Sequence, residues 1–345
     1  MILDPILDLF RGRAVTIPPM DGAFRPNTAL EEAPVFAALP EPDNLALWKG
    51  QVIASSGNAL HALAEGEAPR LVAPFAAPVS ALAVSPSGAL AVALETGALL
   101  LDGAPVEKPA EIRCITALAF DAEGALWLAN GSAAHAPADW AADLMTRGAS
   151  GSLWRAQAGR FTRMATGLGF PNGLLPAPGG VVFSESWRHR LMRLDAQGLR
   201  PVLQDIPGYP ARLSPAPGGA LLSVFAPRNR LIELVLQETH YREDMIAQVP
   251  RPYWIAPAYG SGKSFLEPLQ CGGIRTMGVH KPWAPSRSWG LVVRLDADMN
   301  PVQSWHSRAN GTRHGICSAI AAEGRILAAS RGADLVLSLA DREAP

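Results

Sequence analysis

Two stretches of the chain, FPNGLLPAPGGVVFSESWRHRLMRL at residues 170–194 and YPARLSPAPGGALLSVFAPRNRLIEL at residues 209–234, repeat one another almost letter for letter. Each pattern predicts a short strand, a turn at Pro-Gly-Gly, a second apolar strand, a polar turn and a third strand that begins at an arginine. A hairpin that recurs in this way indicates a repeat architecture, in which each copy is one structural unit.

Four weaker copies extend the same hairpin across the chain. They are PDNLALWKGQVIASSGNALHAL (42–63), VSALAVSPSGALAVALETGALLLDG (79–103), ITALAFDAEGALWLANG (115–131) and GICSAIAAEGRILAASRGADLVLSL (315–339). The glycines assigned to the six hairpin turns are Gly50, Gly88, Gly124, Gly180, Gly219 and Gly324. The shorter spacings between them are about 40 residues, close to the length of one four-stranded propeller blade.

The repeat predicts an all-β fold, a six-bladed β-propeller that forms one domain over residues 1–345. Sheets stacked around an axis bury both faces and keep their edges short. A β-sandwich is the alternative, but it would not show the same hairpin six times. Residues 1–40 are expected to form an N-terminal extension and closing segment.

Two longer spacings in the repeat predict insertions, at about residues 132–152 and 238–289. The first includes AADLMTRG, which predicts a short helix, and the second is rich in Tyr, Trp, Pro and Gly. Long loops in compact domains are usually functional or disordered, and the second segment is too aromatic for disorder. We expect both near the channel mouth, the second as an ordered lid; a structural brace or a dimer contact is the alternative.

The composition indicates a globular protein without a strong charge, since 48% of residues are hydrophobic, 18% are charged and the net charge is −1. This balance argues against nucleic acid or an anionic membrane as the main partner. No apolar run reaches the ~20 residues of a membrane span, and residues 1–13 lack the features of a signal peptide. Three cysteines without a CxxC pair fit a reduced compartment, so we predict a cytoplasmic protein.

Several motifs carry a resemblance to a known family. FPNG followed by FSESWRHRLMRLD (183–195), DIPGYPARL (205–213), KPWAPSRSWGLVVRLDADM (281–299) and HGICSAIAAEGRILAAS (314–330) resemble, in order, stretches of the strictosidine synthase-like and SMP-30/gluconolactonase group, which includes the paraoxonases. The resemblance covers nearly the whole chain from about residue 40, and the bacterial strictosidine synthase-like proteins look most similar. It implies a six-bladed propeller and, in the hydrolytic members, a calcium ion in the channel that polarises an ester carbonyl.

Aligning the copies on their turns places one residue of each blade at the channel mouth. The calcium ligands that the resemblance implies fall on Asp43, Asn44, Asn172 and Thr116. In blade five, however, Ala211 and Arg212 stand where the family has an Asp-Asn pair. The sequence therefore leaves two alternatives, a calcium site or an Arg212 that takes the place of the cation and pairs with Asp43. No other cofactor is expected.

Further candidate residues lie near the predicted mouth. His314 precedes the innermost strand of blade six and is the candidate general base, or else a surface-loop histidine. Cys317 stands roughly where strictosidine synthase has its catalytic glutamate, and is either a nucleophile or a small buried side chain. Four tryptophans are candidates to wall an apolar substrate pocket: Trp187, Trp254, Trp283 and Trp289.

The leading functional hypothesis is a small-molecule hydrolase of lactones or esters that acts at the channel mouth. In its metal-free version, Arg212 stabilises the oxyanion, Asp43 holds Arg212, and His314 activates water. One alternative is a condensing enzyme or lyase of strictosidine synthase type, weakened by the missing glutamate. The other is a non-catalytic propeller that binds a small molecule or a protein, since propellers host many unrelated functions. The physiological substrate and the oligomeric state stay open.

Overall fold

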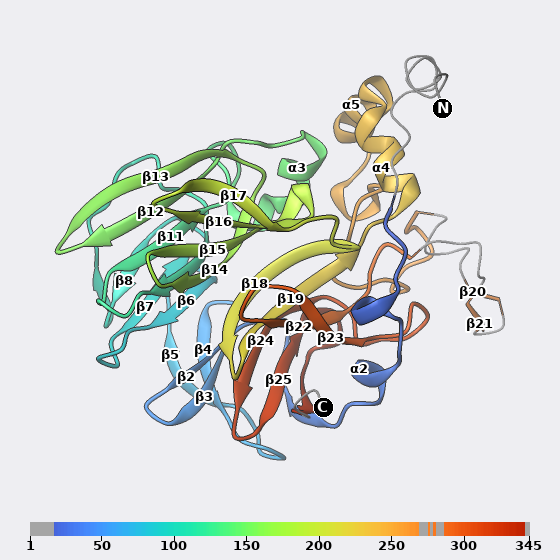
Figure 1. The fold of residues 1–345 in the computed structure, drawn as a ribbon. Coiled ribbons are helices and arrows are strands. Elements are labelled where there is room, and N and C mark those ends of the chain that lie inside the picture. The colour runs from blue at the N-terminus through green and yellow to red at the C-terminus, as the bar shows by residue number, and fades with distance from the viewer. Residues whose placement is uncertain (1–16, 269–274, 277–278, 281–285, 342–345) are drawn as a thin grey trace.

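The computed structural model describes residues 17–268, 275–276, 279–280 and 286–341. Its strands form six antiparallel four-stranded sheets, which confirms the predicted six-bladed β-propeller (Figure 1). Blade one contains β2 (Pro42–Trp48), β3 (Gln51–Ser56), β4 (Ala59–Leu63) and β5 (Arg70–Pro74). Blade two contains β6 (Val79–Val84), β7 (Leu90–Leu94), β8 (Leu99–Leu101) and β9 (Ala104–Pro105). Blade three contains β10 (Ile115–Phe120), β11 (Leu126–Asn130), β12 (Gly151–Gln157) and β13 (Arg160–Leu168).

The other three blades follow the same plan. Blade four contains β14 (Pro171–Ala177), β15 (Gly180–Glu185), β16 (Arg190–Asp195) and β17 (Gly198–Leu203). Blade five contains β18 (Gly208–Ala216), β19 (Gly219–Pro227), β22 (Leu291–Asp296) and β23 (Pro301–His306). Blade six contains β24 (Ile316–Ala322), β25 (Arg325–Ser330), β26 (Leu335–Ala340) and β1 (Val35–Ala38). The innermost strands β2, β6, β10, β14, β18 and β24 contact one another around a closed ring. A separate two-stranded ribbon contains β20 (Arg275–Thr276) and β21 (Val279–His280).

The ring is closed by a strand from near the N-terminus. β1 pairs antiparallel with β26, with Val35 opposite Leu337, and so becomes the outermost strand of the last blade. Because blade six takes strands from both ends of the described chain, it can form only when these two segments meet.

Glycines at the hairpin turns serve two different needs. Gly88 and Gly124 have φ of +89° and +78°, a backbone conformation that other residues rarely adopt. In the Pro-Gly-Gly turn of blade four, the first glycine, Gly179, takes the positive φ of +75°. The second, Gly180, is needed for space, because a Cβ there would lie 2.0 Å from the carbonyl oxygen of Leu194.

Small apolar side chains let neighbouring blades pack closely. Between blades two and three, Ala81, Ala91 and Ala93 meet Ile115 and Leu128, and none of the five is exposed. The alanines bring the sheets together while the larger side chains fill the remaining space. This accounts for the alanine-rich strands of the repeat.

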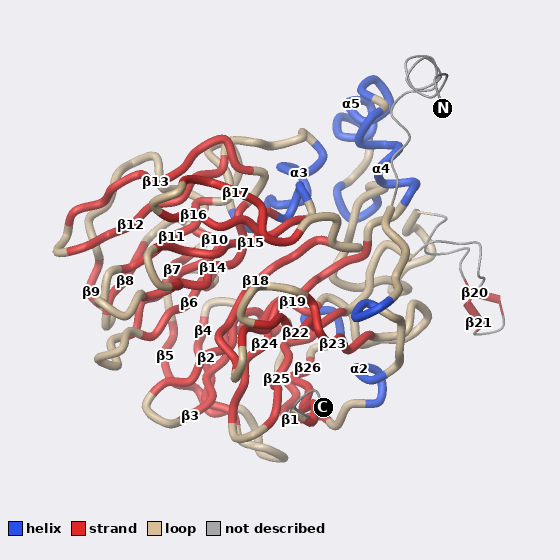
Figure 2. The backbone as a smooth tube through the Cα atoms, viewed as in Figure 1, coloured by secondary structure: helices blue, strands red, loops and turns tan. Residues whose placement is uncertain are grey.

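Both predicted insertions are helical and pack against each other (Figures 1 and 2). The first contains α3 (Trp140–Met145), which confirms the expected short helix. The second contains α4 (Arg230–Gln237), α5 (Thr239–Gln248) and the 3₁₀ turn η4 (Arg251–Tyr253). Side chains of both insertions share one buried cluster, which includes Met145, Val235 and Met245.

The third strand expected within residues 209–234 was wrong. Residues from Arg230 form α4, and the third strand of blade five is β22, on the far side of the insertion. The insertion therefore begins after Pro227, earlier than the expected residue 238. Asn229 caps the helix, since its side chain accepts a hydrogen bond from Leu231 N at 2.8 Å.

Among the described residues, no helix is both long and apolar enough to cross a membrane. The N-terminal segment 1–16, Cys271 and Trp283 lie outside the described residues.

Candidate functional site

The innermost strand of every blade carries a β-bulge near the start of the strand. Thr116 is an example, because it lies between Ile115, paired with Asn130, and Ala117, paired with Ala129, and has no partner of its own. The residues at the six bulges are Asp43 and Asn44, Ser80, Thr116, Asn172, Ala211 and Arg212, and Cys317. A bulge re-aims a side chain that regular pleating would point elsewhere, and here it does so once per blade.

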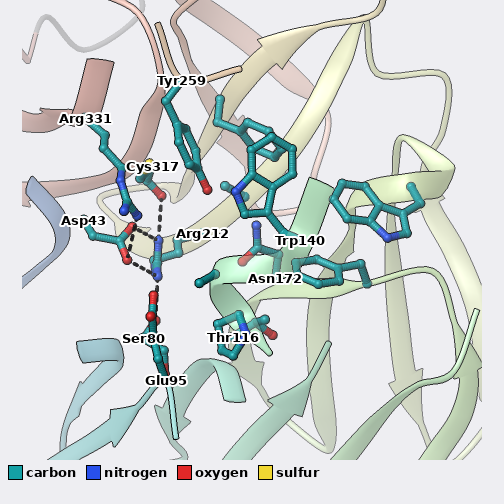
Figure 3. Close-up of a pocket in the computed structure, with 16 residues that line it drawn as sticks. Asp43, Ser80, Glu95, Thr116, Trp140, Asn172, Arg212, Tyr259, Cys317 and Arg331 are labelled. Atoms are coloured by element: carbon teal, nitrogen blue, oxygen red, sulfur yellow. Dashed lines mark hydrogen bonds and ion pairs between the residues drawn. The ribbon is translucent and has the colours of Figure 1, made fainter. Parts of the chain in front are cut away.

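All of these bulged residues except Asn44 line one cavity of about 120 Å³, which we call the upper cavity (Figure 3). Its polar lining consists of Asp43, Ser80, Glu95, Thr116, Asn172, Arg212 and Arg331, and Cys317 borders it as well. Its aromatic lining consists of Trp140, Phe170, Trp187, Phe225 and Tyr259. The structure thus brings Asp43, Asn172, Thr116 and Arg212 together, as the alignment of the copies predicted, and Trp187, one of the four candidate pocket tryptophans, lines the same cavity.

Arg212 forms a two-pronged ion pair with Asp43. Its two terminal nitrogens lie 2.9 and 3.2 Å from the two carboxylate oxygens. They also donate to the carbonyl oxygens of Ser80 at 2.8 Å and Cys317 at 3.4 Å. A single guanidinium on blade five therefore contacts blades one, two and six at the axis. The remaining donor, Nε, is buried and has no partner among the described residues.

A second arginine adds positive charge beside this pair. Arg331 lies 3.8 Å from Asp43 and 3.3 Å from Glu41, and its guanidinium stacks 4.9 Å from the ring centre of Tyr259. Burial raises the pKa of Tyr259, so its phenol stays neutral at ordinary pH. Arg212 and Arg331 balance the charges of Asp43 and Glu41, and their guanidinium donors on this side of the upper cavity suit an oxygen that gains negative charge.

Glu95 is a lining residue that the sequence interpretation missed. Its carboxylate has no hydrogen bond or ion pair within the described part of the chain. Burial raises the pKa of Glu95 above its ordinary value, although Arg331 acts in the opposite direction. Both Glu95 and Arg331 stand directly after the second strand of a blade, where β7 and β25 end. The second strand runs antiparallel to the bulged strand, so the residue that follows it lies at the same end of the channel. This position in the repeat could have identified both residues from the sequence.

The other polar side chains differ in the hydrogen bonds that they leave free. Thr116 Oγ1 lies 2.5 Å from the carbonyl oxygen of Pro171, to which it donates, so its proton is committed. The Asn172 amide forms no hydrogen bond within the described residues, and Ser80 Oγ is buried without a partner there. Ser80 Oγ therefore lacks the partner that buried polar groups usually have. The half-buried amide of Asn172 lines the upper cavity and can donate to a ligand there.

The insertions supply two of the five aromatic lining residues, Trp140 and Tyr259. Trp140 of α3 packs 5.2 Å from Phe225 and 5.1 Å from Tyr259, measured between ring centres. Trp187 stacks on Phe170 at 4.5 Å, and its Nε1 donates to Asp143 of α3 at 2.7 Å. Each insertion therefore contributes an aromatic side chain to the lining of the upper cavity, and the lid role of the second insertion stays a prediction.

Two of the predicted pocket tryptophans lie elsewhere. Trp254 donates from Nε1 to Val249 O at 2.7 Å and packs with the helices of the second insertion. Trp289 donates to Ser307 O at 2.9 Å and packs in the core of blade five. In both tryptophans the only side-chain donor, Nε1, binds a nearby backbone carbonyl oxygen, and this hydrogen bond holds the ring away from the upper cavity.

His314 does not line the upper cavity. The residue is buried, its Nδ1 lies 2.7 Å from Ser288 Oγ, and its Nε2 lies 2.8 Å from Arg308 O. Since a carbonyl only accepts, Nε2 carries the proton of that bond and holds the ring in place. Cys317 does border the cavity, but burial raises the pKa of its thiol, which keeps it protonated.

The residues around the axis do not fit the calcium ion that the resemblance implies. Both oxygens of Asp43 and the nearest carbonyl oxygens are already bound by the guanidinium of Arg212, a fixed positive charge that would repel a second cation. Asn44 donates to Ser55 Oγ at 2.9 Å and does not line the upper cavity. Within the described residues, no group of three or more His, Cys, Asp or Glu could hold a metal ion.

Solved structures of other proteins share this fold. A gluconolactonase from Xanthomonas campestris matches with a TM-score of 0.53 and 16% identity, over 89% of this chain and 87% of its own. A candidate gluconolactonase matches with a TM-score of 0.54 and 13% identity, over 90% and 91%. No protein-family model and no curated protein matches the sequence. At such identities the likeness extends to the propeller fold, and closeness to strictosidine synthase-like proteins stays a prediction.

Proposed function

We propose that the protein is a metal-independent hydrolase of a small lactone or ester, which reacts in the upper cavity. One observation carries the proposal: a guanidinium, Arg212, is fixed by Asp43 at the propeller axis, in a chamber covered by aromatic side chains. It supplies the permanent positive charge that a metal supplies in other hydrolases. The propeller fold shared with gluconolactonases supports the same reaction class.

The developing oxyanion would be held by donors from two neighbouring blades. Arg212 Nε and the Asn172 amide both lack partners among the described residues, and they belong to neighbouring blades. Gly173 permits this closeness, because a Cβ there would lie 2.3 Å from the carbonyl oxygen of Ala211. Donors that are in place before the reaction cost little reorganisation when charge moves onto the carbonyl oxygen.

The rest of the cavity selects the substrate. The space beside the two arginines is small, since the whole chamber measures about 120 Å³. The walls contributed by Trp140, Trp187 and Tyr259 favour an apolar or planar body and exclude water from the reacting carbonyl. A compact neutral lactone or short ester matches these properties.

The test is a panel of γ-butyrolactone, δ-valerolactone and phenyl acetate, assayed with and without a chelator. We expect turnover of at least one of them, unchanged by EDTA. Asn172→Ala should lower kcat/KM by about 10²–10³-fold, because it removes one oxyanion donor. Asn58→Ala is the matched control, since Asn58 is an exposed residue whose amide bonds only the backbone of Phe75.

Two results would contradict the proposal. Activity that disappears with EDTA and returns with calcium would establish a metal centre. A folded protein that binds δ-valerolactam, the non-hydrolysable analogue, but turns over no lactone or ester would be a binding propeller.

A further inference from the structure

The two carboxylates that line the upper cavity are in different states. Asp43 is bound by the guanidinium of Arg212, with Arg331 beside it, so its negative charge is compensated by ion pairs. Glu95 has no such partner within the described residues, and it is half-buried at the edge of the same chamber. Two acidic groups held in contrasting environments are typical of sites where one positions and the other exchanges a proton.

Glu95 is placed firmly although its carboxylate is unpaired. It follows β7 directly, Leu94 pairs with Val79, and Glu95 N donates to Pro78 O at 2.8 Å. The backbone therefore fixes Glu95 close to the bulge at Ser80, whose buried Oγ has no partner among the described residues. Figure 3 shows Ser80 and Glu95 on the same side of the cavity, next to Arg212.

We propose that Glu95 is the catalytic proton acceptor of the hydrolysis, and that Ser80 Oγ holds the attacking water for it. The inference rests on the proposed hydrolase function and names the group that moves the proton. His314 cannot fill this role from its place outside the cavity, where both ring nitrogens are bonded. Thr116 and Cys317 keep their own protons.

The step balances with water as the only co-reactant. Water loses one proton to the Glu95 carboxylate as its oxygen bonds to the acyl carbon, and the carbonyl electron pair moves to the oxygen that faces Arg212 and Asn172. When this pair returns, the bond from the acyl carbon to the ring or alkoxy oxygen breaks. Glu95 gives its proton to that leaving oxygen and ends as a carboxylate.

The charges around Glu95 are consistent with this task. Burial raises its pKa, Arg331 lowers it, and Asp43, Asp139 and Glu41 raise it, with a net upward change. A base works when deprotonated, so activity should fall as the pH drops through this raised pKa. The acid limb should therefore lie at a higher pH than an ordinary glutamate would give.

The test compares Glu95→Gln with the wild type on the best substrate of the panel, across pH. We expect kcat to fall about 10²–10⁴-fold with KM changed less than about threefold, and the acid limb to vanish from the residual rate. Binding of δ-valerolactam, followed by tryptophan fluorescence, should persist. Glu67→Gln removes the same charge from an exposed turn and is the control that should behave as wild type.

Each other result has a separate meaning. A wild type without turnover contradicts the proposed hydrolase itself. An active wild type together with a Glu95→Gln variant that keeps its rate and acid limb overturns the role of Glu95. Loss of δ-valerolactam binding in parallel with the rate also overturns it, because Glu95 would then be a binding residue.

Discussion

The six innermost strands carry different kinds of side chain at two levels of the channel, at their bulges and just beyond them. At their bulges, the residues that line the upper cavity differ from blade to blade: Asp43, Ser80, Thr116, Asn172, Arg212 and Cys317. One to three residues further on, each strand contributes a similar apolar side chain to what we call the apolar collar: Leu45, Leu82, Leu118, Leu174, Leu213 and Ile320. Below the collar, the channel widens to about 560 Å³ with mostly apolar walls.

The comparison separates the positions at which the fold requires an apolar side chain from the positions at which the side chain can vary and serve a functional site. The collar residues face one another around the axis, so an apolar side chain is favoured in every blade. The bulged residues are unpaired in the sheet, so their identity can vary without loss of ladder hydrogen bonds. Arg212 borders both regions and forms the partition between them.

Removal of Arg212 should give the largest effect. Arg212→Ala leaves Asp43 only partly compensated by Arg331, and we expect a loss of about 3 kcal/mol in the free energy of unfolding, with no measurable turnover. The matched control is Arg200→Ala on the outer strands, which breaks an equally two-pronged pair with Asp195 in an exposed setting. Urea unfolding of both variants measures the contrast.

A charge-free double variant sharpens the same point. Arg212→Leu combined with Asp43→Leu should recover at least half of the lost stability while activity stays absent, because the unpaired charge is gone but the cation is too. A double variant with recovered activity would contradict the role of Arg212. Equal destabilisation by Arg200→Ala would show that position at the axis does not matter.

The apolar collar should respond in the opposite way. Leu118→Ala removes a buried side chain and should cost about 2–4 kcal/mol in unfolding free energy, with kcat/KM changed less than threefold. Leu71→Ala on an outer strand is the control, since Leu71 is 56% exposed. A collar variant that lost activity but not stability would break the division between the two heights.

The repeat was enough to predict the blades, and the alignment of the copies was enough to place Asp43, Asn172 and Arg212 at one cavity. This worked because a propeller brings equivalent positions to a common axis. Glu95 and Arg331 were missed because only the innermost strand was aligned, although the residue after the second strand reaches the same mouth.

Other misses depend on tertiary contacts that the sequence does not display. His314 precedes an innermost strand as predicted, but its two hydrogen bonds hold it in a buried position outside the cavity. RLIELVLQ reads equally as a strand or as one face of a helix, and the cap at Asn229 decides for the helix. The tryptophan positions depend on which backbone carbonyl each Nε1 meets.

The smallest effect is expected at Cys317, a bulged residue to which the proposed mechanism gives no role. Burial raises the pKa of its thiol, so at pH 8 it stays protonated and should resist iodoacetamide in the folded protein but not in urea. Cys317→Ser keeps size and shape and should retain kcat/KM within about threefold. Mass spectrometry of the labelled peptides separates Cys317 from Cys114, whose pKa burial raises to about 12. Rapid alkylation of Cys317 with loss of activity would instead identify a nucleophile, and would transfer the chemistry from the Glu95 side of the cavity to blade six.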